Sequence, residues 1–452
     1  MLRFFRSKDK PADDQSTQPA PEAPDIVDEQ AEDDDALTRA ALAAEDDGDE
    51  GMERSWTARA AAVIPGGAST GSKRPAALYG SDTDFWPTHY VAARGCELET
   101  PSGQHVVDCS MALGAVALGY GDGGVRDAVQ RAVAAGNVSG LSSVLEVTVA
   151  ERLCDAIPCA ERVRFLKTGA EAVAAAVRIA RAATGRMHVI GSGYFGWLDW
   201  WSEHAGVPAG AHADFTGVPF DDVEALRAAV RAAGRDLAAI VLEPVVERLP
   251  SAEWMAEARA LCDASGALLV FDEMKTGFRL ASGGYQQYAG VTPDLAAFGK
   301  AMANGFPLAA VVGRAGPMEE GCGRTWISST LAGEAVGLAA AAAVIDRHAE
   351  EDVCAALWRT GGALRESVGA AMRTSGIEGV TLEGIDPMWF LRWDSPARES
   401  AWLGTALAHG VLFKRGAYNY AALPHEELLT DIERAASAAF VELVETADGD
   451  AE

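Results

Sequence analysis

Residues 267–313 read ALLVFDEMKTGFRLASGGYQQYAGVTPDLAAFGKAMANGFPLAAVVG. Four apolar residues, LLVF, precede Asp272, and a run without a polar face predicts a strand buried on both sides in a parallel sheet. Lys300 follows a second apolar run, LAAF, so we expect its amine to be partly withdrawn from water. Such burial lowers the pKa of a lysine and makes the amine available as a nucleophile.

Asp272 and Lys300 together permit two interpretations. A carboxylate that keeps a pyridine nitrogen protonated and a lysine that bonds to an aldehyde are the two groups that a pyridoxal phosphate site requires. The alternative is a structural ion pair between strand ends, because a carboxylate at the end of a buried strand needs a partner. These two residues alone leave both interpretations open.

The length, composition and charge of the chain restrict its possible domain organisation and its possible partners. It has 452 residues, of which 49% are hydrophobic, so we expect a globular protein of two domains. Its net charge is −28, which argues against nucleic acid as a partner. Residues 1–52 contain sixteen acidic and five basic residues, and their composition predicts a disordered acidic tail with at most a short helix near residues 36–44.

The sequence also indicates in which compartment of the cell the protein is located. No apolar run is long enough to span a bilayer, and the first ten residues, MLRFFRSKDK, lack the apolar core of a signal peptide. The seven cysteines are scattered, without the spacing of a metal site. We therefore expect a cytoplasmic protein with reduced thiols, no bound metal and no membrane partner.

Apolar strands alternate with helices in the middle of the chain. We predict strands at residues 163–167, 187–190, 238–244 and 267–271, and helices at 170–183, 221–233 and 252–264. Before them we predict a helix at 53–64 and a hairpin around 101–103. The alternation predicts an α/β fold with a mainly parallel sheet, whose ligand lies at the carboxyl ends of the strands.

Two hydroxyl-rich turns are candidate anion sites. The amides of Gly169 and Ala170, with the Thr168 hydroxyl, lie at the start of a predicted helix, where a phosphate is favoured. Thr330 precedes another predicted helix, which we place from about residue 331. The alternative in both cases is ordinary helix capping, with Glu171 completing a capping box after Thr168.

Two further residues lie at or after the ends of predicted strands, at the same end of the sheet. Tyr194 follows a glycine-rich turn, and its ring is a candidate for stacking on a planar cofactor, although loop aromatics more commonly pack on their neighbours. Glu243 closes the next predicted strand and adds a second acid beside Asp272.

The ordered set of motifs resembles a known family. TGAEA, YxG, EP, DExxTGFR, FGKAxANGxP and STLAG occur in this order at predicted strand ends. This set resembles the class III (ω-type) aminotransferases, which are pyridoxal phosphate enzymes of fold type I, over residues 53–445. IPGG at 64–67 and DEMKTGFR at 272–279 are most similar to the glutamate-1-semialdehyde 2,1-aminomutase branch of the family.

The resemblance implies a fold and a division into domains. It implies a large α/β domain with a mainly parallel seven-stranded sheet and a smaller α+β domain. The large, cofactor-binding domain would comprise residues 116–330. The small domain would combine residues 53–115 with residues 331–452, after the tail of residues 1–52.

The resemblance also implies roles for individual residues. Lys300 would form the aldimine with pyridoxal phosphate and move the substrate proton, and Asp272 would pair with the pyridinium nitrogen. Tyr194 would stack on the ring, and Glu243 would lie near its phenolic side.

The phosphate would be held in two ways. Thr168, Gly169 and Ala170 would bind it within one subunit. Thr330 would reach the phosphate of the other subunit, so the resemblance implies a homodimer with shared active sites.

The implied activity is transfer of an amino group from a small-molecule donor to a carbonyl acceptor. Three alternatives share the same motifs: an intramolecular aminomutase, a racemase or epimerase, and a pyridoxal phosphate-fold protein that binds without turnover. The motifs do not separate these four.

Several positions depart from the aminomutase pattern and bear on the substrate. YFGW at 194–197 replaces Tyr-His-Gly-His, and Lys275 replaces an uncharged residue. Trp197 and Lys275, together with Lys73 and Arg74 after the IPGG turn, are our candidates for substrate contacts. The alternatives are packing for the tryptophan and a solvated pair for Lys73 and Arg74. Glu334 and Ala335 replace the family's Asn-Pro, which also argues for a different substrate.

Overall fold

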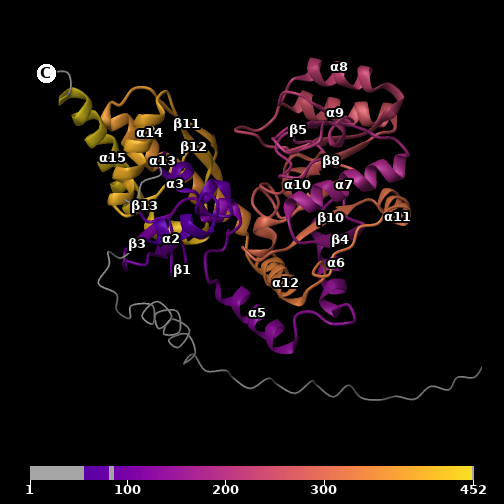
Figure 1. Cartoon of the computed structure of the whole chain (residues 1–452), viewed down its shortest axis with the longest axis horizontal. Helices are drawn as coiled ribbons and strands as arrows, with labels where there is room; N and C mark the ends of the chain where they lie inside the picture. The colour runs from indigo at the N-terminus through magenta and orange to yellow at the C-terminus, as the bar shows by residue number, and fades with distance from the viewer. Residues whose placement is uncertain (1–54, 81–85, 450–452) are drawn as a thin grey trace, which may run out of the picture. The chain divides into compact units, whose positions relative to one another are not determined.

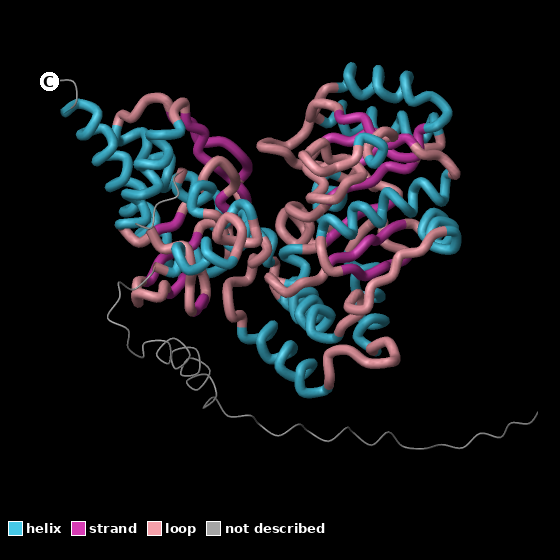
Figure 2. Tube along the Cα trace, in the orientation of Figure 1, coloured by secondary structure: helices cyan, strands magenta, loops and turns pink. Residues whose placement is uncertain are grey.

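The structure is a computed structural model that describes residues 55–80 and 86–449 (Figures 1 and 2). The predicted acidic tail of residues 1–52 and the short helix predicted near residues 36–44 lie outside the described residues. Within the two described ranges, no helix is both long enough and apolar enough to cross a membrane.

A seven-stranded sheet is built from residues 162–313 (Figure 1). Its strands lie in the order β4-β10-β9-β8-β7-β5-β6. Their bounds are β4 Arg162–Leu166, β5 His188–Ser192, β6 Phe215–Gly217, β7 Leu237–Leu242, β8 Leu268–Asp272, β9 Leu295–Phe298 and β10 Ala309–Gly313. All neighbouring pairs are parallel except those of β10 with β4 and with β9. The predicted α/β fold with a mainly parallel seven-stranded sheet is therefore confirmed.

The strands of this sheet are buried on both faces, as their continuous apolar sequences predict. In β7, Ala239 and Val241 pack in the cluster that contains α7 (Gly169–Thr184). Ile240 and Leu242 point to the other face and join the cluster that contains α9 (Ala252–Ser265). This alternation follows from the two-residue period of a strand, and in Figure 2 the magenta strands lie between cyan helices.

Polar caps and glycines set the ends of the helices that cover the sheet. Thr168 caps α7, and Gly185, in the left-handed conformation, ends it. Ser251 caps α9 in the same way, and Asp222 caps α8 (Val223–Ala233). The predicted bounds of these three helices agree with the structure to within two residues.

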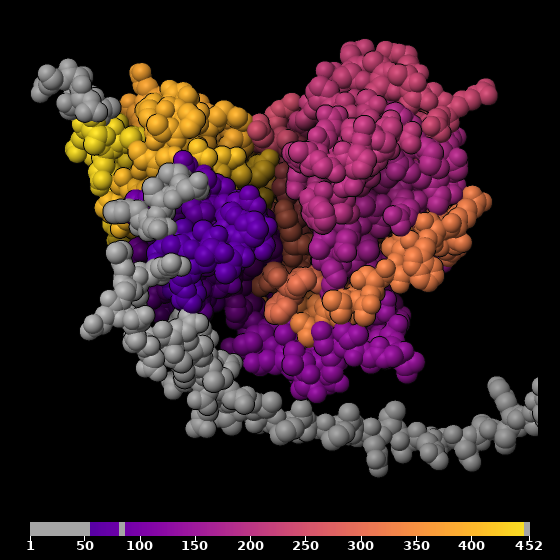
Figure 3. All heavy atoms as spheres, viewed as in Figure 1, coloured from indigo at the N-terminus to yellow at the C-terminus, as the bar shows by residue number. Residues whose placement is uncertain are grey.

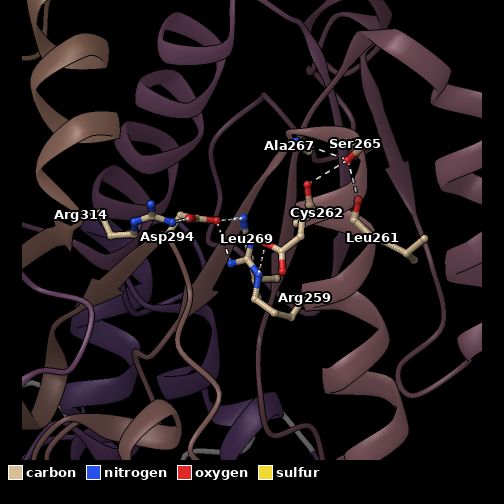
Figure 4. A network of polar contacts seen from close by, with 9 residues as sticks. Arg259, Leu261, Cys262, Ser265, Ala267, Leu269, Asp294 and Arg314 are labelled. Carbon is tan, nitrogen blue, oxygen red and sulfur yellow. Dashed lines mark hydrogen bonds and ion pairs between the residues drawn. The ribbon is translucent and has the colours of Figure 1, made fainter.

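A buried carboxylate, Asp294, directly precedes β9, at the end of this strand opposite to Lys300. Figure 4 shows its contacts with Arg259, Arg314 and Leu269. Asp294 is 3% exposed in its side chain and receives the guanidinium groups of Arg259 and Arg314 at 2.9 and 2.6 Å. The backbone amide of Leu269 donates to the same carboxylate at 2.8 Å. These contacts join α9 to β8, β9 and β10, and so hold the strands that bring Asp272 and Lys300 together.

Strands from both ends of the described chain pair with each other. β1 (Ala92–Arg94), β2 (Glu97–Glu99) and β3 (His105–Asp108) form antiparallel pairs, with the predicted hairpin between β2 and β3. β13 (Val411–Leu412) then adds parallel to β3. In Figure 3 the indigo N-terminal atoms accordingly lie beside the orange and yellow C-terminal atoms. This pairing agrees with a small domain formed from both ends of the chain. The exact boundaries of the two domains remain a prediction.

The other elements complete the fold around these sheets. A three-stranded antiparallel sheet contains β11 (Val380–Ile385), β12 (Met388–Trp393) and β14 (Asn419–Tyr420). The remaining helices are α2 Trp56–Val63, α3 Pro75–Tyr79, α4 Met111–Gly114, α5 Gly123–Ala135, α6 Val144–Ala156, α10 Gly284–Ala289, α11 Ala315–Arg324, α12 Ala335–Glu350, α13 Val353–Ser375, α14 Pro396–Ala408 and α15 Leu429–Gly449. Short 3₁₀ turns are η1 Gly71–Lys73, η2 Ala209–Ala211, η3 Gly234–Asp236, η4 Lys300–Ala303 and η5 Leu423–Leu428.

Candidate active site

A cavity of about 640 Å³ lies at the carboxyl ends of the central strands. Most of the predicted site residues line it. The lining comprises Lys167, Gly169, Ala170, Tyr194, Phe195, Gly196, Trp197, Glu243, Val246, Glu247, Asp272, Met274, Lys275, Lys300, Phe306, Pro307, Leu308, Phe390, Gly416, Ala417 and Tyr418. The cavity therefore combines residues at and just after the ends of strands of the seven-stranded sheet with Phe390 and residues 416–418.

Lys300 begins the turn that follows β9, and its backbone is in the left-handed region with φ +47°. This conformation is unfavourable for a residue with a Cβ atom, and such outliers cluster at functional sites. Burial and the nearby charge of Lys275 lower the pKa of the Lys300 amine to about 8. A substantial fraction of this amine is therefore uncharged, and nucleophilic, just above neutral pH.

Asp272 ends β8 and is only 5% exposed. Burial raises its pKa to about 7, and the neighbouring Glu243 carboxylate adds to the effect. One carboxylate oxygen accepts the backbone amide of Met274 at 3.0 Å. The next residue, Glu273, points into the core and accepts the amides of Tyr285 and Gln286, so the two adjacent acids have separate functions.

Glu243 and Lys275 form an ion pair within the cavity wall. The Lys275 Nζ lies 2.6 Å from Glu243 Oε1, and the two side chains are 12% and 11% exposed. The other Glu243 oxygen accepts the backbone amide of Tyr194 at 3.1 Å. Glu243 therefore joins the loop that carries Tyr194 to the turn that carries Lys275.

The start of α7 forms a second wall of the cavity. The Thr168 hydroxyl accepts the Glu171 amide at 3.2 Å, and the Glu171 carboxylate accepts the Thr168 amide at 2.9 Å. Thr168 and Glu171 therefore form the capping box that we considered as the alternative. Thr168 is not among the described residues that line the cavity. The amides of Gly169 and Ala170 belong to the first turn, whose donors have no partner within the helix.

A glycine lets a loop approach this helix closely. A Cβ atom on Gly196, which has φ +84°, would lie 2.4 Å from the Ala170 Cβ. The loop of residues 193–197 can therefore lie against the helix start only because position 196 has no side chain. On the same loop, the rings of Tyr194 and Trp197 are 63% and 73% exposed and line the cavity.

These residues fit pyridoxal phosphate in their chemistry. The first-turn amides and the close approach at Gly196 suit a phosphate group. The buried Asp272 carboxylate suits a protonated ring nitrogen, and the Lys300 amine suits a carbonyl. The exposed ring of Tyr194 suits a planar partner.

Three predicted residues lie away from this cavity. Thr330 lines a second cavity, of about 720 Å³, together with residues 135–146. Its hydroxyl does not cap α12, because Glu334 takes that place by accepting the amides of Val336 and Gly337. For this reason α12 begins at Ala335, later than predicted. Lys73 and Arg74 directly precede α3 and are not among the described residues that line the first cavity.

Two residues make polar contacts that support the site and were not predicted from the sequence. Lys167, at the end of β4, donates to Pro307 O at 2.6 Å and pairs with Glu334 at 2.5 Å. Asn304, which has φ +43°, accepts the amides of Ala117 and Leu118, both at 3.0 Å. Charged and amide residues near turns are common, so only the structure identifies which of them bridge distant segments.

Comparison with known proteins gives an independent result. Residues 79–196 and 207–419 match the family described as aminotransferase class-III. The chain is 32% identical to the 3-aminobutyryl-CoA aminotransferase of Cloacimonas acidaminovorans over 317 residues, which are 68% of this chain and 76% of that protein. It is 33% identical to the glutamate-1-semialdehyde 2,1-aminomutase of Rhodopirellula baltica over 340 residues, which are 71% of this chain and 76% of that protein.

Solved structures agree with this match. The internal aldimine form of FumI from Sphingopyxis sp. MTA144, which contains pyridoxal phosphate, superposes with a TM-score of 0.82 and 26% sequence identity. The superposition covers 86% of this chain and 96% of FumI.

Proposed function

We propose that this chain, which belongs to the class III aminotransferase family, transfers an amino group from a small-molecule amine to a carbonyl acceptor with Lys300 as its reactive amine. Its cofactor is pyridoxal phosphate, as in the family. The two substrates and the roles of individual residues are part of the proposal.

One observation carries the assignment of Lys300. Lys275 and Lys300 both line the cavity, and their environments shift their pKa values in opposite directions. The pKa of Lys300 is lowered to about 8 by burial and by Lys275. Burial also disfavours the charge of Lys275, but Glu243, Tyr418 and Tyr420 outweigh burial and raise its pKa. Of the two amines, only Lys300 is available as a nucleophile at neutral pH.

The chemistry divides between the cofactor and the protein. Pyridoxal phosphate, when bound, supplies an electron-accepting ring and a carbonyl group that bonds to amines. The amides of Gly169 and Ala170 would hold its phosphate, Asp272 its ring nitrogen, and Tyr194 one face of the ring. Lys300 Nζ is the base that accepts the proton leaving the donor carbon and later returns a proton to the product.

The test is the visible absorption spectrum of the full-length chain with pyridoxal phosphate, before and after addition of single amino donors, with Lys300→Ala as the control. We expect a visible band that a productive donor removes and that the variant lacks. A wild-type chain without this band in the presence of the cofactor would contradict the proposal. A band that no donor changes would support binding without turnover.

An intramolecular aminomutase is the second candidate, because the relative from Rhodopirellula baltica carries that name. The two activities differ in whether turnover needs a separate amino donor. Product formation from one substrate alone, after one round of cofactor loading, would favour the aminomutase. A strict requirement for a second amine would favour the aminotransferase.

We further propose a homodimer in which Thr330 completes the site of the partner. Two apolar residues that line the second cavity are exposed, Leu141 by 85% and Val144 by 79%. Leu331, next to Thr330 in the sequence, is 50% exposed. Sedimentation velocity of the full-length chain tests this, and a monomer at micromolar concentration would contradict it.

A further inference from the structure

Lys275 is the charged residue that departs from the aminomutase pattern beside Asp272. Its amine already has partners within the protein: Glu243 lies 2.6 Å away, and the hydroxyl of Tyr418 lies 3.5 Å away. The ammonium also lies 4.5 Å from the centre of the Tyr418 ring, within range of a cation–π contact. A substrate carboxylate would have to compete with these partners.

We propose that Lys275 is a positioning residue for the reaction of Lys300: its ammonium, fixed by Glu243, acts on the neighbouring amine through its charge and not by binding substrate. This inference rests on the proposed function, because it assumes that Lys300 is the reactive amine.

The surroundings of the two lysines give the physical reason. Lys275 keeps its proton, because Glu243, Tyr418 and Tyr420 favour its charged form. A fixed positive charge in a buried wall disfavours a second charge nearby, and this effect is stronger than in water. After burial, Lys275 is the largest influence that lowers the pKa of Lys300.

Other charges also face Lys300, and burial is the largest cause of its lowered pKa. Asp272 and Glu243 favour a charged Lys300, and Arg279 opposes it. Asp272 is itself a weak counter-charge near neutral pH, because burial raises its pKa to about 7. Glu243 is divided between Lys275 and the Tyr194 amide. The balance leaves Lys300 partly uncharged.

The proposal is tested by competitive labelling of the full-length chain freed of cofactor. Trace acetic anhydride is applied across a range of pH, and the labelling of Lys300 and Lys275 is measured by mass spectrometry of peptides. In the wild type, Lys300 should react at a lower pH than Lys275. In Lys275→Met, the curve of Lys300 should move to higher pH, and each unit of movement lowers its labelling at pH 7 about tenfold.

Two variants separate charge from structure. Lys275→Arg retains the charge and should restore the wild-type curve of Lys300. Lys73→Met removes the charge of an exposed lysine outside the described lining of the cavity and should leave the curve in place. An unchanged Lys300 curve in Lys275→Met, with only a raised KM for the amino donor, would overturn the proposal in favour of substrate binding.

A double variant covers the possibility that Lys275→Met does not fold. Glu243→Gln with Lys275→Met leaves no unpaired charge in the wall. The Lys300 curve should lie at higher pH in this double variant than in Glu243→Gln alone, and equal curves would overturn the proposal. The labelling does not depend on cofactor binding. Failure to bind pyridoxal phosphate would therefore reject the proposed function, whereas an unmoved labelling curve would reject only the role of Lys275.

Discussion

Lys167 at the end of β4 and Glu334 at the start of α12 form an ion pair with 2.5 Å between their charged atoms, although 167 positions separate them in the chain. Their side chains are 14% and 8% exposed. The same carboxylate caps α12 through the amides of Val336 and Gly337. The Glu334 that departs from the aminomutase pattern thus joins the wall of the cavity to a buried helix.

Glu334→Gln should lower the free energy of unfolding by about 2 kcal/mol, because it leaves the Lys167 ammonium without its counter-charge in a poorly hydrated place. Urea unfolding at pH 7 measures this. Glu319→Gln is the matched control, since the Arg162–Glu319 pair is exposed (53% and 62%) and should contribute under about 1 kcal/mol. Equal losses in the two variants would contradict the importance of the buried pair.

Lys300→Gly should be more stable than Lys300→Ala by about 1 kcal/mol in the cofactor-free protein. Position 300 has φ +47°, which glycine adopts freely and alanine does not. Thermal unfolding of the two variants without cofactor makes the comparison, and both lack the reactive amine. A more stable alanine variant would show that the backbone at position 300 is not strained.

Gly196→Ala should weaken the binding of pyridoxal phosphate by about tenfold or more, since its Cβ would lie 2.4 Å from Ala170 Cβ and displace the helix start. Gly185→Ala, at the other end of α7, is the control: its φ is +68°, yet a Cβ there meets nothing within 4 Å. Titration with the cofactor, followed by absorbance, should show unchanged affinity for the control. Similar losses in both variants would mean that backbone strain, and not the contact with Ala170, is responsible.

Asp272→Asn should stabilise the cofactor-free protein increasingly as the pH rises. Burial raises the pKa of Asp272 to about 7, above the value of about 4 for an unfolded chain. The unfolded chain therefore releases this proton from about pH 4, whereas the folded state holds it up to about pH 7, and the wild type loses stability over this range. The difference between the variant and the wild type should grow over this range, to about 4 kcal/mol at most, and stay constant above it. Chemical unfolding at several pH values tests this, and a difference that does not depend on pH would contradict it.

Much of the fold follows from the sequence because its elements have distinct local patterns. The apolar strands β7 and β8 and the capped helix α7 lie where their sequences predict them. The direction of β10 could not be predicted, because AAVVG is buried on both faces and reads the same in a parallel or an antiparallel position. The three-residue strand β6 has too few residues to show a period.

The sequence predicts which residues at the strand ends belong to the site. It does not predict which of them pair with one another. Asp272 and Lys300 stand out because charges follow apolar runs. The sequence placed a charge at Lys275 beside them, but that Glu243 holds this charge depends on how two separate strands end side by side. The capping box of Thr168, in contrast, could be predicted, because it depends only on residues close together in the sequence, and the structure contains it.

Lys300, and not Lys275, is the amine that we propose bonds to pyridoxal phosphate. The direct measurement is borohydride reduction of the full-length chain with the cofactor, followed by mass spectrometry of its peptides. We predict that the pyridoxyl phosphate group is found on Lys300 alone and is lost in Lys300→Ala. Attachment of the group to Lys275, or a protein that retains no such group after reduction, would contradict the role of Lys300.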